Sequence, residues 1–169
     1  EAGLPKANIH YYFPAKRDLY VTVLEDIFSE WRQDADAFEL HDDPATALSA
    51  YIKSKLAHSF ARPDASKVWA TEIIQGAPVI GEDLNKDLVP WMNSKVSVIQ
   101  AWMDRGLIAK VSPQNLIYTI WATTQHFADF KHQIKIINNN QDLNQAQKLQ
   151  VERDVTAMLL RSVGLEVSA

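Results

Sequence analysis

The stretch at residues 19–38, LYVTVLEDIFSEWRQDADAF, decides the fold class. Its apolar residues recur at three- and four-residue steps: Leu19, Val23, Leu24, Ile27, Phe28, Trp31 and Phe38. This spacing places them on one side of an α-helix, where they form a continuous apolar stripe. The sequence therefore predicts a partly buried helix over about residues 15–40.

Similar patterns predict further helices along the rest of the chain. Asp43 followed by Pro44 and Ser112 followed by Pro113 are typical of helix starts, because aspartate and serine cap free backbone N–H groups and proline suits the first turn. Apolar stripes then cover residues 48–60, 65–73, 84–103, 113–137 and 151–159. No segment alternates apolar and polar residues over the length of a strand. The predicted fold class is all-α.

The composition is that of a globular protein of 169 residues, with 47% hydrophobic and 22% charged residues. The net charge of −4 argues against a basic nucleic-acid-binding module. There is no cysteine, which excludes disulfides and zinc–thiolate sites. No apolar run approaches the roughly 18 residues of a membrane-spanning helix. We therefore expect a cytoplasmic protein with no membrane partner.

The sequence offers no support for catalysis. There is no glycine-rich phosphate loop, no G-x-S-x-G motif and no cysteine nucleophile. His126 and His132 are six residues apart and lie on different faces of the predicted helix, unlike the i, i+4 pairs that bind metals. We expect a protein that is not an enzyme and that has no metal or cofactor.

The opening stretch at residues 2–20, AGLPKANIHYYFPAKRDLY, is short, aromatic and basic. A helix that reads DNA needs polar side chains for base edges, and lysines or hydroxyl groups for phosphates. The candidates for DNA contact are Lys6, Asn8, His10, Tyr11 and Lys16. The alternative from the residues alone is a plain surface helix with two aromatic side chains in a core.

This stretch resembles the end of the helix-turn-helix of TetR-family repressors. The resemblance rests on Lys6, Asn8, Tyr11, Phe13, Pro14 and Lys16. Two positions depart from the family pattern: Pro5 stands where a serine or threonine cap is usual, and His10 where the first tyrosine is usual. The resemblance implies a homodimer that binds operator DNA. Residues 1–20 would then be the last part of the helix-turn-helix domain, whose first helices precede residue 1, and residues 21–169 an effector-binding and dimerisation domain.

Two later strings resemble the ligand domain of a pyrimidine-responsive subgroup of the same family. They are VWATEIIQGAPVI at residues 68–80 and SPQNLIYTIWATTQHFADF at residues 112–130. The resemblance implies a pocket among the helices for a small effector such as uracil or thymine. It also implies that the last two helices pair across a two-fold axis into a four-helix bundle.

The residues of the second string support a polar pocket independently. Trp121 and Gln125 are four residues apart and share a helix face with Tyr118. An indole can stack on a flat ring, and an amide supplies one donor and one acceptor. The alternative is that Trp121 is core and that Gln125 bonds a neighbouring backbone group.

Three further residues complete the predicted effector site. Glu72 lies in the apolar stripe 65–73, where an unpaired carboxylate would be costly, so either a ligand N–H or an internal Lys, Arg or Trp must satisfy it. Trp69 belongs to the same stripe. Trp31 lies late on the first long helix, where the family pattern makes it a pocket wall that could pass ligand binding to the DNA-binding end. Ordinary core packing is the alternative for Trp31.

The last two predicted helices carry more apolar residues than one small core needs. We expect them to form the interface of a homodimer, the alternative being a hairpin within one chain. The predicted interface residues are Ile120, Phe127, Phe130, Ile134, Val151, Val155, Met158 and Leu159. Two other functions remain open: a regulator of the same fold that senses an acyl or aromatic acid, and a helical dimerisation module without an effector.

Overall fold

The computed structural model describes residues 12–166, and in that range it contains helices and no strands. The helices are α2 (Lys16–Asp34), α3 (Ala37–Leu40), α4 (Pro44–Ala61), α5 (Pro63–Ile74), α6 (Gly81–Asp104), α7 (Pro113–Asp129), α8 (Lys131–Ile137) and α9 (Gln145–Ser162). The predicted all-α class is confirmed. None of the helices in the described range is long and apolar enough to cross a membrane.

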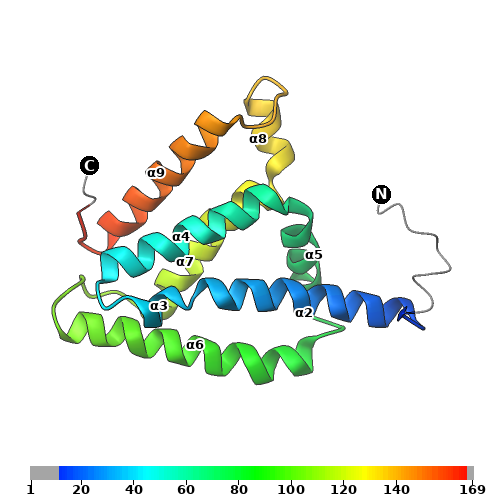
Figure 1. Cartoon of the computed structure of the whole chain (residues 1–169), viewed down its shortest axis with the longest axis horizontal. Helices are drawn as coiled ribbons and strands as arrows, with labels where there is room; N and C mark the ends of the chain where they lie inside the picture. Colours follow the sequence, from blue (N-terminus) through cyan, green and yellow to red (C-terminus); the bar gives the residue numbers. More distant parts are fainter. Residues whose placement is uncertain (1–11, 167–169) are drawn as a thin grey trace.

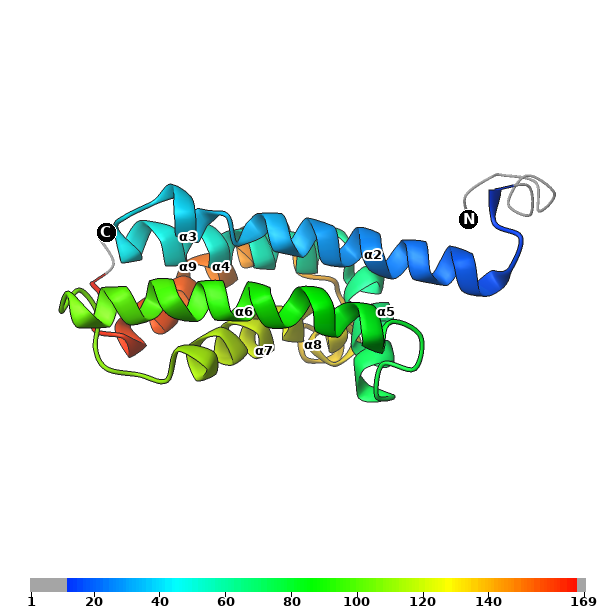
Figure 2. The ribbon, with the colours of Figure 1, turned by 90° about the horizontal axis from the view of Figure 1, so that it is seen from below.

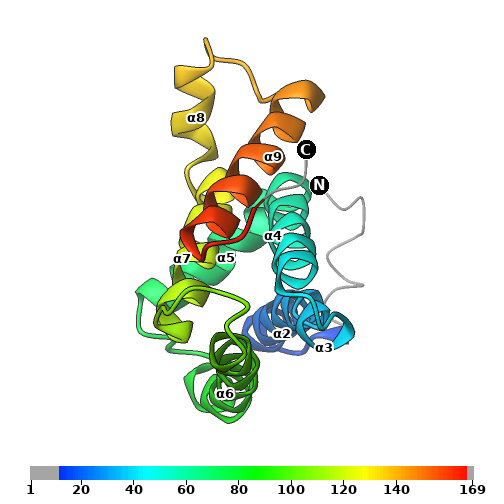
Figure 3. The same cartoon turned by 90° about the vertical axis from the view of Figure 1, so that its left-hand side faces the viewer.

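Helix α4 is the centre of the fold. It packs against α2, α3, α5, α7 and α9 (Figure 1). The long helices α2 and α6 run alongside each other below it in Figure 1, and Figure 2 shows both along their full length. Helices α8 and α9 lie on the opposite side of the molecule from α6, as the end view in Figure 3 shows.

The apolar side chains form two separate clusters. The larger joins α3, α4, α6, α7 and α9 around the fully buried Tyr51, Leu56 and Ile117. The smaller joins α2, α5 and the segment before α6, around Ile27 and Trp69. Helix α2 therefore belongs to a different core from α9, and the space between the clusters is where a cavity forms.

Two predicted helix starts are confirmed by their caps. The Asp43 carboxylate accepts the Thr46 backbone N–H at 2.8 Å, with Pro44 as the first residue of α4. Ser112 accepts the Asn115 N–H at 3.3 Å before Pro113 opens α7. These short polar side chains satisfy N–H groups that a helix leaves free at its first turn.

The prediction of unbroken helices over residues 15–40 and 113–137 is wrong at one point in each. Helix α2 ends at Asp34, because the N–H groups of Ala35 and Asp36 bond carbonyls only three residues back and tighten the backbone into a turn. A second break at Phe130, with φ of −107°, separates α7 from α8. An apolar stripe carries no information about such a break, because its residues can stay on the same side of both helices.

The predicted DNA-contacting residues are almost all beyond the described range. Lys6, Asn8, His10 and Tyr11 lie outside the described residues. Lys16 is the first residue of α2 and is exposed.

Candidate functional site

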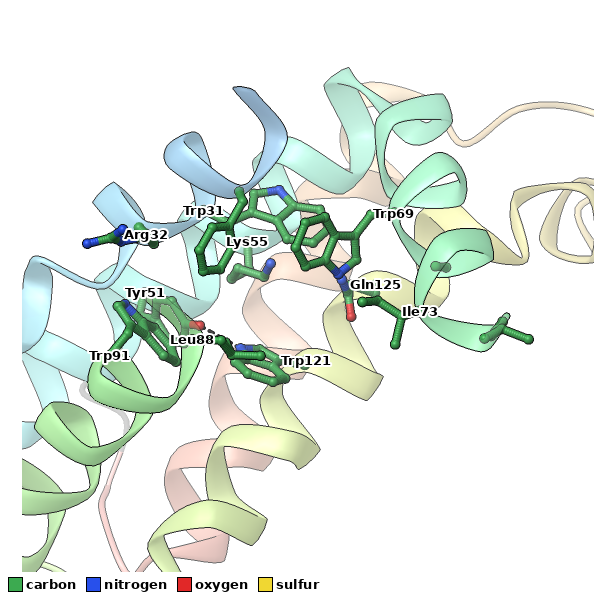
Figure 4. A pocket seen from close by; sticks show the side chains of 13 residues that line it. Trp31, Arg32, Tyr51, Lys55, Trp69, Ile73, Leu88, Trp91, Trp121 and Gln125 are labelled. Carbon is green, nitrogen blue, oxygen red and sulfur yellow. Dashed lines mark hydrogen bonds between the residues drawn. The ribbon is translucent and has the colours of Figure 1, made fainter. Parts of the chain in front are cut away.

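A cavity of about 290 Å³ opens between α2, α4, α5, α6 and α7. Aromatic side chains from all five helices form most of its wall: Phe28, Trp31, Tyr51, Trp69, Trp91 and Trp121. The polar residues among its lining are Arg32, Lys55 and Gln125. Figure 4 shows Lys55 pointing into the space between Trp31, Trp121 and Gln125. The volume and the aromatic walls suit a small flat molecule.

One wall of the cavity is fixed by aromatic contacts between α2 and α5. The ring of Phe28 stacks on Trp69 with centroids 5.4 Å apart, and Trp31 meets the same indole edge-on at 5.5 Å. Contacts of this kind add to the stabilisation from burial alone. Helix α2 is therefore held to the cavity by the side chains that a ligand would touch.

The opposite wall is fixed by a partly buried hydrogen bond. The Trp121 indole N–H donates to the Tyr51 hydroxyl at 2.7 Å, and Trp91 stacks on Trp121 at 5.8 Å. Burial raises the pKa of Tyr51 well above its usual value, so the hydroxyl stays neutral and keeps its proton. Because its oxygen accepts from Trp121, that proton remains free to donate.

Lys55 is the most unusual residue of the cavity. Lys55 is only 3% exposed, and its ammonium lies 3.8 Å from the centroid of the Trp31 ring. No hydrogen-bond acceptor or ion-pair partner reaches it from residues 12–166. Burial lowers the pKa of Lys55 to about 8, against the opposing attraction of Asp34 and Asp129. The group therefore remains mostly an ammonium ion at neutral pH.

The structure brings four of the predicted effector residues together and leaves two outside. Trp31, Trp69, Trp121 and Gln125 all line the cavity. Tyr118 shares the helix with Trp121 and lies 5.9 Å from its ring, yet it is half exposed and does not line the cavity. No hydrogen bond of Gln125 to another described residue is formed, so its amide is available to a ligand.

Glu72 is the other predicted residue that lies outside the cavity lining. Its carboxylate accepts hydrogen bonds from the backbone N–H groups of Val79 (2.7 Å) and Ile80 (3.2 Å) and from the Tyr20 hydroxyl (3.1 Å). These donors are internal, although none is the Lys, Arg or Trp that the sequence led us to expect. Glu72 thus ties the end of α5 to α2 and to the segment before α6.

Sequence reasoning missed Lys55, Tyr51 and Trp91 as cavity residues. A signal for Lys55 was present, because it follows Leu48 by seven residues and Tyr51 by four and so shares their apolar face. A lysine on such a face is either satisfied inside the protein or open to a ligand. Trp91 had no comparable signal, since its place depends on how α6 packs against α7.

The predicted dimer residues divide into two groups. Ile120, Val155 and Leu159 are buried in the core of the single chain, which corrects their assignment to an outer interface. Phe130 and Met158 are more than half exposed. The remaining predicted residues are partly buried: Phe127, Ile134 and Val151. Ile136, Ile137 and Leu149 add exposed apolar side chains on α8 and α9.

Comparison with known proteins identifies the family of the chain. The family model for the C-terminal region of YcdC-like proteins, a TetR-type domain, matches residues 24–166. The HTH-type transcriptional regulator RutR of Escherichia coli K12 is 36% identical over 160 residues, which cover 89% of this chain and 76% of the relative. The protein of the same name from Shigella flexneri matches with the same values. The chain belongs to the TetR family of transcriptional regulators. It is a regulator and not an enzyme. The cavity is therefore a candidate binding site, not a candidate active site.

Proposed function

We propose that this regulator is a repressor that binds operator DNA as a homodimer and is released by a small flat heteroaromatic effector, such as uracil or thymine, bound in the cavity. The observation that carries the proposal is the cavity itself. Its aromatic walls suit a flat ring, and the Gln125 amide is free to match a donor and an acceptor on the edge of that ring.

Helix α2 offers a physical route from the cavity to DNA. It carries Trp31 at the cavity and begins at Lys16, next to the residues that resemble a recognition helix. At 1.5 Å per residue, the two positions are roughly 22 Å apart along the helix. A small tilt of α2 caused by a ligand at Trp31 would therefore displace its other end. Dimers must match half-sites about one turn of DNA apart, so such a displacement weakens operator binding.

The proposed boundary between the DNA-binding domain and the effector and dimerisation domain follows the prediction from the sequence. Residues 1–20 would belong to the DNA-binding domain and residues 21–169 to the effector and dimerisation domain. The match of a C-terminal-region family model to residues 24–166 supports this boundary. The exposed apolar side chains of Phe130, Ile137 and Met158 support dimerisation through α8, α9 and the end of α7.

The competing hypothesis is a dimerisation module without an effector. Such a module has no need of an interior space. A cavity of about 290 Å³ that contains an unpaired ammonium and a free amide argues against it.

Calorimetric titration with uracil and thymine tests the effector proposal. We expect one of them to bind, and Gln125→Ala to weaken that binding about tenfold, as expected for the loss of about 1.4 kcal/mol of hydrogen bonding. Gln114→Ala is the matched control, because Gln114 is exposed on the same helix. If neither pyrimidine binds, or if the two variants behave alike, the proposed effector is wrong.

Sedimentation analysis tests the dimer separately. We expect the wild-type chain to sediment as a dimer and the double variant Phe130→Asp, Met158→Asp to sediment as a monomer. A wild-type monomer at micromolar concentration would contradict the proposed interface.

A further inference from the structure

The charges that line the cavity are unbalanced. Of its thirteen lining residues, Arg32 and Lys55 are basic and none is acidic. Arg32 is exposed and has Asp87 as an ion-pair partner at 3.7 Å. Lys55 is buried and forms no ion pair or hydrogen bond with the other described residues, although Asp34 and Asp129 attract its ammonium from further away.

Two other buried charged groups of the described chain do have direct partners. Lys95 is as deeply buried as Lys55, and its ammonium forms an ion pair with Glu39. Glu72 accepts three hydrogen bonds. Since buried charges in folded proteins are ordinarily paired or hydrogen-bonded, a buried ammonium without a direct partner at a cavity wall is placed to pair with a group from outside the chain.

The hydrogen-bonding groups around the cavity point the same way. The Tyr51 hydroxyl proton has no acceptor among the described residues, and its oxygen accepts from Trp121. Tyr51 and Lys55 both line the cavity, so the hydroxyl and the ammonium are hydrogen-bond donors of its lining without an acceptor. The only free side-chain acceptor among the lining residues is the Gln125 carbonyl. A neutral pyrimidine can pair with the Gln125 amide, but it brings no negative charge to the Lys55 ammonium.

We infer that the effector is an aromatic or heteroaromatic acid, whose flat ring lies between the tryptophans and whose carboxylate pairs with the Lys55 ammonium. The inference rests on the proposed function, because it takes the cavity to be the effector site and narrows the effector to anionic members of the flat-ring class. The carboxylate supplies the acceptors that Lys55 and Tyr51 lack. Ammonium–carboxylate hydrogen bonds are about twice as strong as neutral ones, so the acid is preferred over an uncharged ring of equal shape.

Lys55 also lies where it can couple ligand binding to the position of α2. Its ammonium lies over the ring of Trp31, on the last part of α2, and is attracted by Asp34 one turn further along the same helix. Asp129 on α7 attracts it from the other side. A carboxylate in the cavity competes with Asp34 and Asp129 for the ammonium, so anion binding alters the contacts that hold the end of α2.

The test compares acids with their uncharged amides on the full chain by calorimetry at pH 7. The three pairs are uracil-6-carboxylate and uracil-6-carboxamide, benzoate and benzamide, and quinoline-2-carboxylate and quinoline-2-carboxamide. We expect the acid to bind at least tenfold more tightly than its amide in one pair or more. The result that overturns the inference is the absence of an acid preference in all three pairs, which includes the absence of any binding.

Two variants separate charge from shape. Lys55→Gln keeps a donor of similar length without the charge and is expected to abolish the acid preference. Lys95→Gln removes a buried lysine whose charge is already paired, and is expected to preserve the preference. An acid preference that survives in Lys55→Gln overturns the assignment to Lys55. If Lys55→Gln does not fold, the wild-type comparison still decides between acid and amide.

The outcomes distinguish this inference from the proposed function. Binding of uracil or thymine without an acid preference overturns the anionic effector and keeps the pyrimidine effector. A preference for benzoate over benzamide, with no pyrimidine bound, supports the anionic effector and overturns the pyrimidine effector.

Discussion

Glu72 and Lys55 are both buried and charged, with exposed fractions of 1% and 3%, yet their surroundings differ completely. Around Glu72 the chain provides two backbone N–H groups and a tyrosine hydroxyl. Around Lys55 it provides the face of Trp31 and no acceptor. A buried charge with a full set of partners stabilises the fold. A buried charge without a direct partner at a cavity is a candidate ligand-binding group.

The two regions also differ in what surrounds them. Glu72 lies where three segments meet, at the end of α5, on the path to α6 and against Tyr20 of α2. Burial and the hydrogen bond to Glu72 raise the pKa of Tyr20. Lys55 faces a space of about 290 Å³ instead. The comparison predicts opposite effects on stability when each charge is removed.

Glu72→Ala is expected to have the largest effect. It leaves the N–H groups of Val79 and Ile80 without an acceptor, and the loss of several such bonds to a charged group costs about 3 kcal/mol of unfolding free energy. Chemical denaturation measures this change. Glu82→Ala is the control, because Glu82 is exposed in the first turn of α6, and it is expected to change stability by no more than about 0.5 kcal/mol. A loss below 1 kcal/mol for Glu72→Ala would contradict the claim that the hydrogen bonds of Glu72 stabilise the fold.

Lys55→Met is expected to stabilise the ligand-free chain by about 2 kcal/mol. One pKa unit corresponds to roughly 1.4 kcal/mol, and the contact with Trp31 offsets part of the cost of burying the ammonium. A thermal-unfolding scan would show a rise of several degrees in Tm. Destabilisation of similar size would mean that Lys55 has partners like those of Glu72.

The pH dependence of this effect has a definite sign. The pKa of Lys55 is about 8 in the folded chain, below its ordinary value of 10.5, so burial disfavours the ammonium. The cost is fully present below pH 8 and disappears as the pH rises from 8 to 10.5. The stability advantage of Lys55→Met over the wild type is therefore expected to shrink across that window. An advantage that stays constant from pH 7 to 10 would contradict the assignment.

Lys95→Met is expected to give the smallest change. The partner of Lys95 is Glu39, a residue that is exposed and can be hydrated when the lysine is lost. We expect a loss of less than about 1 kcal/mol by denaturant unfolding. A loss as large as that of Glu72→Ala would show that exposure of the partner does not limit the effect.

Much of the fold could be predicted from the sequence, because helical periodicity and caps are local properties. The starts of α4 and α7 at Pro44 and Pro113 follow from residues within one turn of each other. The breaks at Ala35 and Phe130 could not be predicted in this way. The apolar stripe continues across both, and the path of the chain there depends on packing between distant helices.

The candidate site could be predicted only in part. Trp121 and Gln125 were found because a spacing of four residues is enough to place them on one face. Lys55 and Trp91 reach the same space from α4 and α6, whose contacts are set by the tertiary fold. Glu72 was recognised as a group that needs partners, but whether those would be a ligand or the chain itself depended on the turn at residues 75–80.

Proton uptake during ligand binding tests the central claim most directly. At pH 8.5, above its pKa of about 8, Lys55 is largely uncharged in the free chain. Calorimetry with benzoate in two buffers of different ionisation enthalpy measures the protons taken up. The account predicts an uptake of more than about half a proton per benzoate bound by the wild type and none for Lys55→Gln. Binding of benzoate by the wild type without proton uptake would contradict it, because the charge would then lie elsewhere than against Lys55.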